Sequence, residues 1–263
     1  LAPMSSDRLA KALAHQYCRL MTIRFHHSDH TGRVDDEAAI VQFEKGWSTY
    51  QKVFDHNALA HREVEEALLR ALSTIHDPVD FLDIACGDAG QMRRALVGSK
   101  VRHYRGIDLS RPALELAARN LEGVSFDCDL HHADFVAELT ARHYASDVSW
   151  CGLSIHHLTV DRKRAVFQAL SDTTSRCLMV YEPILREGES LKSCFDRYAQ
   201  LNKPAWTFLT ADEWDEVFHH ISTYDLPETP RTWMELGLEA GFSEAREIYV
   251  DPLGFYGLYR YDR

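Results

Sequence analysis

The chain has 263 residues, of which 45% are hydrophobic, and its formal net charge is −11. This length suits one large α/β domain with additions, and the hydrophobic content is that of an ordinary globular protein. Nucleic-acid enzymes usually carry a basic stripe, but no long run of Lys and Arg is present here. We therefore expect neither nucleic acid nor an anionic membrane as a partner.

The six cysteines are scattered, and none forms a C-x-x-C pair. Several lie in apolar, strand-like stretches, as reduced core cysteines do. No signal peptide and no apolar run long enough to span a membrane is evident. These features predict a cytoplasmic protein in a reducing compartment.

The first 78 residues are predicted to be mainly helical. Apolar residues recur at helical spacing over 5–27, around 40–54 and most clearly over 57–75. The dipeptide Asp77-Pro78 ends the third helix. Tyr50 and Trp47, in the second helix, are candidates for closing over a ligand.

Residues 79–90, VDFLDIACGDAG, read as a buried strand, a turn of small residues and the start of a helix. Gly87 in this turn permits positive φ and close approach of a ligand to the backbone. The following helix offers free N–H groups at its first turn. Asp83 interrupts the apolar strand, and because an unpaired buried charge is costly, we expect it to have a partner.

A second strand, within 103–110, ends in Asp108. An acidic residue about 20 positions after the small-residue turn, at the tip of the next strand, is placed to accept hydrogen bonds from ribose hydroxyls. The ordinary alternative is an aspartate that caps a turn or a helix.

The rest of the chain alternates strands and helices, which predicts parallel strands with right-handed crossovers. The alternation is interrupted by an aromatic-rich part that we interpret as irregular. A helix and two closely spaced strands, an expected antiparallel hairpin, follow it. In chain order we predict strands at 124–128, 146–153 and 177–183, helices at 110–123 and 161–174, the irregular part at 184–228, a helix at 229–240 and the hairpin up to 263.

The motif DIACGDAG, residues 83–90, resembles the first motif of class I S-adenosylmethionine (SAM)-dependent methyltransferases. Ala85 and Ala89 stand where that family usually has glycine. The dinucleotide fingerprint G-x-G-x-x-G is absent, which argues against NAD. The resemblance covers roughly 79–183 and 229–263.

The resemblance implies an α/β fold with a Rossmann-like, seven-stranded sheet in the order 3-2-1-4-5-7-6, its last strand antiparallel and helices on both faces. It also implies four parts of the chain. They are an N-terminal helical cover (1–78), a SAM-binding core (79–183), a substrate-side or lid insertion (184–228) and a C-terminal helix and hairpin that complete the core (229–263).

By resemblance, SAM is the cofactor and S-adenosylhomocysteine the product. Asp108 would accept from the ribose hydroxyls, and Leu109 would pack on the adenine. Asp134 with Phe135 is preferred over Asp129 for the other adenine contact. The methionine part of SAM would be lined by Asp83, Ala85, Cys86 and Gly87, with Tyr50 over its carboxylate.

After the fourth strand stands CGLSIHHL, residues 151–158. His156 is a candidate general base, because an ordinary imidazole pKa near 6.5 suits proton removal around neutrality; a capping or core histidine is the alternative, as it is for His157. Glu182, at the end of the fifth strand, is a candidate to bind or deprotonate an acceptor, or else a cap or ion-pair residue.

The sequence also contains residues that could suggest a metal site or a serine hydrolase, but their spacing fits neither. Histidines and a cysteine at 128, 131, 132, 156 and 157 lack metal-binding spacing, so we predict no metal. The stretch GLSIH does not complete the G-x-S-x-G pattern of a serine hydrolase.

The acidic balance and the aromatic insertion favour a small-molecule acceptor in a lidded, mostly apolar pocket. A peptide or protein acceptor, or a SAM-binding protein without turnover, are the alternatives. The identity of the acceptor, the atom methylated and the oligomeric state stay open.

Overall fold

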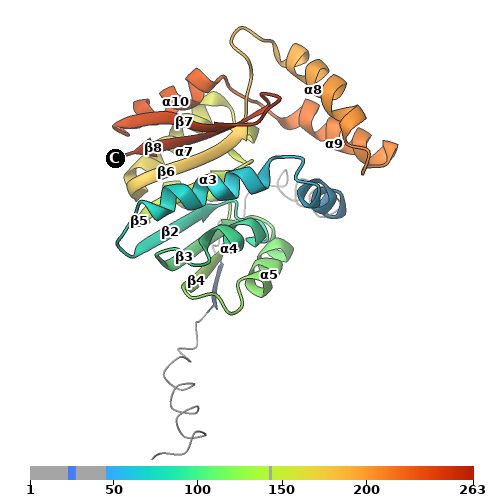
Figure 1. The fold of residues 1–263 in the computed structure, drawn as a ribbon. Coiled ribbons are helices and arrows are strands. Elements are labelled where there is room, and N and C mark those ends of the chain that lie inside the picture. The colour runs from blue at the N-terminus through green and yellow to red at the C-terminus, as the bar shows by residue number, and fades with distance from the viewer. Residues whose placement is uncertain (1–22, 28–45, 142–143) are drawn as a thin grey trace, which may run out of the picture.

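The computed structural model describes residues 23–27, 46–141 and 144–263, and Figure 1 shows a sheet with helices packed around it. The strands are β1 (Ile23–His27), β2 (Val79–Ile84), β3 (Val101–Asp108), β4 (Asp127–His132), β5 (Ser146–Gly152), β6 (Thr174–Pro183), β7 (Glu244–Val250) and β8 (Tyr256–Asp262). The helices are α3 (His61–Ser73), α4 (Gly90–Leu96), α5 (Arg111–Asn120), α6 (Phe135–Ala141), α7 (Val160–Thr173), α8 (Leu191–Ala205), α9 (Ala211–Tyr224) and α10 (Pro230–Glu239). Residues 46–55 are also helical, and a short 3₁₀ helix, η1, spans Ile155–His157.

The eight strands lie in the order β1-β4-β3-β2-β5-β6-β8-β7. Without β1 this is the predicted order 3-2-1-4-5-7-6, so the α/β Rossmann-like prediction is confirmed. The last strand, β8, is antiparallel to both β6 and β7, as predicted. The eighth strand, β1, pairs in parallel with β4 and extends the sheet at that edge.

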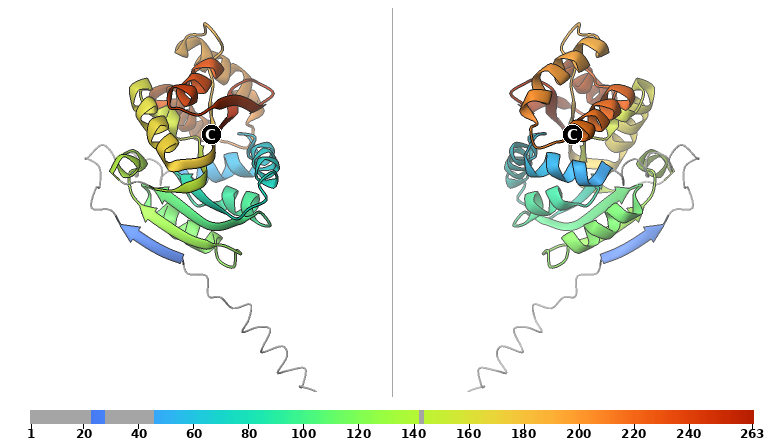
Figure 2. Two further views of the ribbon diagram at one scale, coloured as in Figure 1. Left: turned by 90° about the vertical axis from the view of Figure 1, so that its left-hand side faces the viewer. Right: turned by 90° about the vertical axis from the view of Figure 1, so that its right-hand side faces the viewer.

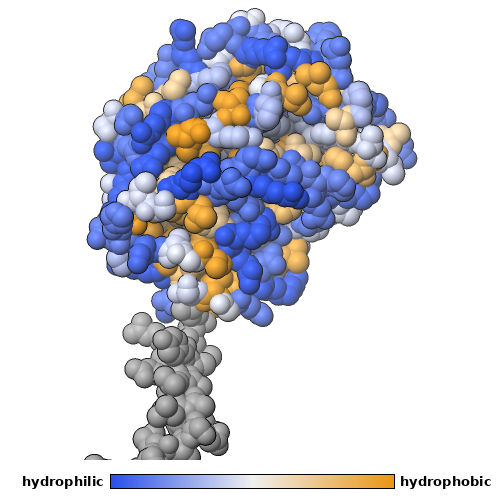
Figure 3. Space-filling view, in the orientation of Figure 1, coloured by the Kyte–Doolittle hydropathy of each residue, from blue (hydrophilic) through white to orange (hydrophobic). Residues whose placement is uncertain are grey.

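Helices cover both faces of the sheet (Figure 2). Side chains along β6 alternate between the faces: Met179 lies in the core under α3, α4 and α5, and Val180 in the core under α6, α7 and α10. Such a strand, buried on both sides, reads as a continuous apolar run. On the face shown in Figure 3, apolar residues lie in small groups among hydrophilic ones. Within the described residues, no helix combines the length and apolarity needed to cross a membrane.

Two sequence predictions at the β1–β4 edge were wrong. Residues 23–27 form a strand rather than the end of a helix, while 5–22 lie outside the described residues. The third predicted strand, 124–128, begins three residues later and continues through His131 and His132. These histidines extend the strand because they pair with β1 on one side and β3 on the other, a tertiary arrangement that apolar patterning does not reveal.

The part predicted as irregular, 184–228, contains two helices, α8 and α9, which extend beyond one end of the sheet (Figure 1). Local signals for both are present: Ser190 caps α8, and Thr210 with Glu213 forms a capping box at α9. The aromatic residues of these helices pack with a residue of the β7–β8 hairpin in a cluster of their own, made by Val53, Tyr198, Trp206, Trp214 and Phe255.

The turn between β2 and α4 has an unusual backbone. Ala85, Gly87 and Ala89 all adopt φ near +54°, alternating with residues of ordinary conformation. Glycine takes this left-handed conformation freely, but an alanine pays a steric penalty because its Cβ crowds the backbone. The two alanines therefore hold the glycine-type turn at some cost in stability.

Replacement of Ala85 by glycine should relieve this strain. We expect Ala85→Gly to raise the free energy of unfolding by up to about 1 kcal/mol, because the left-handed penalty outweighs the added freedom of the unfolded chain. In the matched control Ala118→Gly, within α5, the same substitution should lower stability by about 1 kcal/mol. Urea unfolding measures both, and an equal loss in the two variants would show that the turn is unstrained.

Candidate active site

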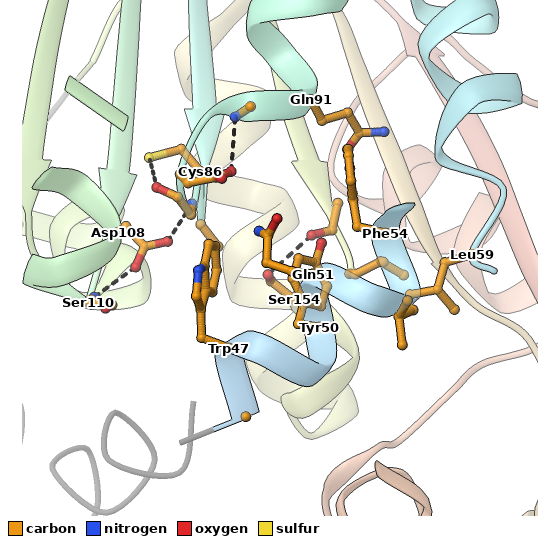
Figure 4. Close-up of a pocket in the computed structure, with 18 of the residues that line it drawn as sticks. Trp47, Tyr50, Gln51, Phe54, Leu59, Cys86, Gln91, Asp108, Ser110 and Ser154 are labelled. Atoms are coloured by element: carbon orange, nitrogen blue, oxygen red, sulfur yellow. Dashed lines mark hydrogen bonds between the residues drawn. The ribbon is translucent and has the colours of Figure 1, made fainter. Parts of the chain in front are cut away.

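A cavity of about 1350 Å³ lies beyond the carboxyl ends of β2, β3 and β5. Its first wall is the β2–α4 turn with the end of β3, and its second is the helix 46–55. The third wall comes from η1, α8, α9 and β8. Figure 4 shows Trp47, Tyr50 and Gln51 on the helix and Asp108 on the sheet beside them. This is the crevice in which doubly wound α/β proteins bind ligands.

Asp83 lines the cavity, although only 2% of its surface is exposed. Its partner is Tyr104 on the neighbouring strand β3, whose hydroxyl donates to Asp83 Oδ2 at 2.5 Å. Burial raises the pKa of Asp83 to about 8, against the lowering effect of the tyrosine hydrogen bond. The expected partner thus exists, but it is neutral, and the carboxyl keeps its proton at neutral pH.

Asp108 holds the turn in place. Its Oδ2 accepts from the backbone N–H of Gly87 at 2.8 Å, and its Oδ1 accepts from that of Ser110 at 2.7 Å. Burial raises the pKa of Asp108, while these backbone donors lower it. A carboxylate has about four acceptor positions, so the side chain retains capacity for further donors in the cavity.

The other turn residues predicted to contact a cofactor also line the cavity: Ala85, Cys86, Gly87 and Leu109. Burial raises the pKa of the Cys86 thiol well above its usual value, so the thiol is not a nucleophile. Tyr50 lines the cavity from the opposite wall, with its ring stacked against Trp47. The structure therefore brings these predicted residues together around one space.

Asp134 and Phe135 do not line this cavity. Asp134 Oδ1 accepts from the N–H groups of Val136 and Ala137 and so caps α6. The alternative, Asp129, is also elsewhere: its carboxylate faces His103 on β3. Neither carboxylate lines the cavity, so the adenine contact at this position stays a prediction.

Glu182 is fully buried at the end of β6 and does not line the cavity. Its carboxylate accepts from the N–H groups of Ser154, Ile155 and His156, which belong to η1 and its approach. It also lies 2.6 Å from His156 Nδ1. Direct contact with an acceptor does not fit this position, since its oxygens are occupied; Glu182 positions η1 instead.

His156 is 5% exposed and lines the cavity between two carboxylates. Nδ1 faces Glu182, and Nε2 lies 3.5 Å from Asp225 Oδ1. Burial lowers the pKa of His156, but the two carboxylates outweigh it and raise the pKa to about 9. A histidine that is protonated at neutrality is a poor general base, so the role predicted from its ordinary pKa does not suit this environment.

Two further cavity residues were not identified from the sequence: Asp225, directly after α9, and His220 within it. Asp225 also lies 3.6 Å from Nδ1 of His157. No local motif marks either residue, because they reach the site only through the packing of α9. The one available signal was the position of the aromatic insertion after the fifth strand of the core.

Comparisons with known proteins agree with this geometry. Residues 81–176 match a family model described as a methyltransferase domain. A search of curated proteins gives no match. Among solved structures, magnesium protoporphyrin IX methyltransferase from Synechocystis PCC 6803 with bound S-adenosylhomocysteine is similar, with 12% identity, a TM-score of 0.61, and 87% of this chain and 99% of that chain covered.

Two other similar structures have comparable coverage. A SAM-dependent methyltransferase from Leishmania major has 14% identity and a TM-score of 0.60, covering 86% of this chain and 82% of that one. A possible exported protein from Bordetella parapertussis has 18% identity and a TM-score of 0.56, covering 77% and 67%. Residues 81–176 thus match a methyltransferase domain, and the chain has the fold of SAM-dependent methyltransferases of known structure.

Proposed function

We propose that this protein transfers a methyl group from SAM to a small-molecule acceptor. The observation that carries the proposal is the composition of the single cavity described above. The first wall has the carboxyl groups of Asp83, Asp88 and Asp108 and a glycine-type turn, and the third wall has histidine and aromatic side chains. The volume of about 1350 Å³ exceeds that of a typical drug-sized site, which leaves space for a cofactor and an acceptor together.

The first wall fits the chemistry of SAM. Asp108 has acceptor capacity for ribose hydroxyls, and Leu109 beside it offers an apolar surface for adenine. Asp83 would face the methionine part, where a buried carboxyl suits an ammonium group. Bound SAM supplies a methyl group on a positively charged sulfur, which is an activated leaving group. The residues at the turn therefore bind and orient.

The third wall of the cavity, formed by η1, α8, α9 and β8, suits an acceptor of mixed character. Tyr198, Trp206 and Tyr256 provide aromatic surface, and the residues of η1 and the end of α9 provide polar groups. The helix 46–55 is tied to the α8–α9 layer: Lys52 pairs with Glu213 at 2.5 Å, and the ring of His56 stacks on Phe208 at 4.1 Å. These contacts cover the cavity from the side opposite the sheet and help to exclude water.

The size and lining of this wall favour a small molecule over a peptide segment, which would need an open groove. Similar solved structures include the methyltransferase of magnesium protoporphyrin IX and a pyocyanin biosynthetic protein. Their names support a small-molecule acceptor without specifying one for this chain. We assign residues 184–228 to the acceptor side of the site.

Calorimetric titration with SAM and with S-adenosylhomocysteine tests the cofactor assignment. We expect both to bind the wild-type protein, and Asp108→Asn to weaken binding by roughly 10- to 100-fold, the equivalent of about 1–3 kcal/mol for hydrogen bonds to a buried charged group. Asp134→Asn is the matched control, because asparagine caps a helix as well as aspartate and Asp134 lies outside the cavity. The affinity of Asp134→Asn for SAM and for S-adenosylhomocysteine should equal that of the wild type.

If Asp134→Asn weakened binding and Asp108→Asn did not, the assignment of the cofactor end would be reversed. Absence of binding to the wild type would remove the proposed function. If the wild-type protein does bind SAM, incubation with SAM and a panel of small hydroxyl, amine and thiol compounds should release S-adenosylhomocysteine. Release only with peptides would select the peptide alternative, and binding without release in either panel would favour a non-catalytic SAM-binding protein.

Cofactor binding should release a proton from Asp83. The pKa of about 8 keeps this carboxyl protonated at pH 7, and an ammonium group placed beside it would lower the pKa and ionise it. Titrations in phosphate and in Tris, whose ionisation enthalpies differ, should show close to one proton passed to the buffer. Asp83→Asn should abolish this difference, whereas an unchanged buffer dependence would place the ammonium group elsewhere.

A further inference from the structure

Three potential metal ligands converge on the acceptor side of the cavity. Asp225 Oδ1 lies 3.5 Å from Nε2 of His156 and 3.6 Å from Nδ1 of His157. All three donor atoms lie within 4.8 Å of one another, and all three residues line the cavity. The residues come from two separate elements, η1 and the end of α9, which are joined where Leu226 N–H donates to the His156 carbonyl at 2.9 Å.

The spacing of these atoms suits a metal ion. Zinc–nitrogen and zinc–oxygen bonds of about 2.0–2.1 Å in a tetrahedral site place neighbouring ligand atoms roughly 3.3 Å apart. The two distances to Asp225 are within a few tenths of an ångström of that value. Two imidazoles and one carboxylate form a donor set that binds divalent first-row metals.

The environment of His156 is that of a metal-binding histidine. Its Nδ1 lies 2.6 Å from the fully buried Glu182 carboxylate, so Nδ1 carries the hydrogen and Nε2 points to the other ligands. A carboxylate that accepts from the far nitrogen of a ligating histidine fixes its tautomer and orientation. Glu182 is itself fixed by the backbone N–H groups of η1.

An independent observation comes from Asp225. Its side chain is only 10% exposed, yet Oδ1 has no hydrogen-bond partner among the described residues. Buried carboxylate oxygens are normally satisfied by a hydrogen bond or a cation. The nearby histidine nitrogens are at 3.5 and 3.6 Å, beyond ordinary hydrogen-bond distance.

We propose that His156, His157 and Asp225 bind one divalent first-row transition-metal ion, with Glu182 as the positioning residue behind His156. Because all three ligands line the cavity, the remaining coordination positions face the acceptor space, where water or an acceptor oxygen would occupy them. A bound metal lowers the pKa of a coordinated hydroxyl group and fixes its position. This role rests on the proposed function, whereas metal binding itself does not.

The competing occupant is a proton. If Nε2 of His156 is protonated, the imidazolium forms an ion pair with Asp225. Nε2 then has no lone pair with which to bind a metal. The sequence spacing of the histidines gave no indication of a metal, because the carboxylate ligand lies 68 positions after His157 in the chain. Direct metal titration distinguishes the two occupants.

Cobalt(II) and zinc(II) are the probes, since cobalt absorption reports ligation and zinc competes for the same site. The experiment uses the full chain, free of any histidine tag and carrying His26→Gln. That substitution removes a second potential cluster, formed by His26, Asp129 and His131 at the β1–β4 edge. We expect one cobalt per chain, with visible bands of a protein-ligated ion that zinc displaces.

Asp225→Asn and His157→Gln should each weaken cobalt binding by at least 10- to 100-fold, the loss typical even for residues behind the ligands. Both leave the His156–Glu182 contact intact, and His157 is partly exposed, so its replacement does not endanger folding. The matched control is His219→Gln, an exposed histidine on α9 that lies outside the cavity. It should bind cobalt like the parent chain.

No cobalt binding by the parent chain, equal binding in all variants, or an equal loss in His219→Gln would each overturn the metal site. Titration of the same preparations with S-adenosylhomocysteine separates this result from the proposed function. Cofactor binding without cobalt binding would defeat only the metal inference. Cobalt binding that depends on Asp225 and His157, without cofactor binding, would support the metal site and defeat the methyltransferase proposal.

Discussion

The side of the cavity formed by η1 depends on the carboxylate of Glu182. This side chain is fully buried at the end of β6, and it accepts from three consecutive backbone N–H groups and faces the ring of His156. A buried charge is tolerated only when it is well paired, and loss of one partner is expensive. The short helix η1 and the orientation of the His156 ring are therefore fixed by one carboxylate in the neighbouring strand.

A second carboxylate organises the β2–α4 turn in a similar way. Asp108 joins the β2–α4 turn to the start of α5 through the N–H groups of Gly87 and Ser110. The turn keeps its left-handed backbone even where alanine replaces glycine, at Ala85 and Ala89. The close packing beneath it also matters: a Cβ on Gly106 would lie 2.8 Å from the sulfur of Cys86. The first and third walls of the cavity thus share one principle, a buried carboxylate that accepts from several backbone donors.

The C-terminal half completes the site from outside the sheet. Helices α8 and α9 form their own apolar cluster with Val53 and Phe255, and this packing brings Asp225 to His156 and His157. Segments far apart in sequence, the helix 46–55 and the end of α9, consequently face the same space (Figure 1).

The apolar patterning of the chain was enough to predict the alternating strands and helices and the terminal hairpin, whereas the order of the seven core strands followed from the family resemblance. The turn residues selected from the sequence line the cavity, and their contact with a cofactor, which the resemblance implies, stays a prediction. The prediction of Asp134 and of a direct role for Glu182 assumed that an acidic residue after a strand faces the ligand. Only the tertiary structure shows that both carboxylates accept from backbone N–H groups.

Tertiary structure alone decided the remaining features. The strand β1 exists through its pairing with β4, and local apolar periodicity had favoured a helix there. The pKa of His156 depends on two carboxylates that are distant in sequence, Glu182 and Asp225. Periodicity and motif spacing report contacts between neighbours in the chain, whereas charge pairing and burial across elements are set by packing. That is why the residues of the β2–α4 turn could be selected from the sequence, whereas Asp225 and His220 could not.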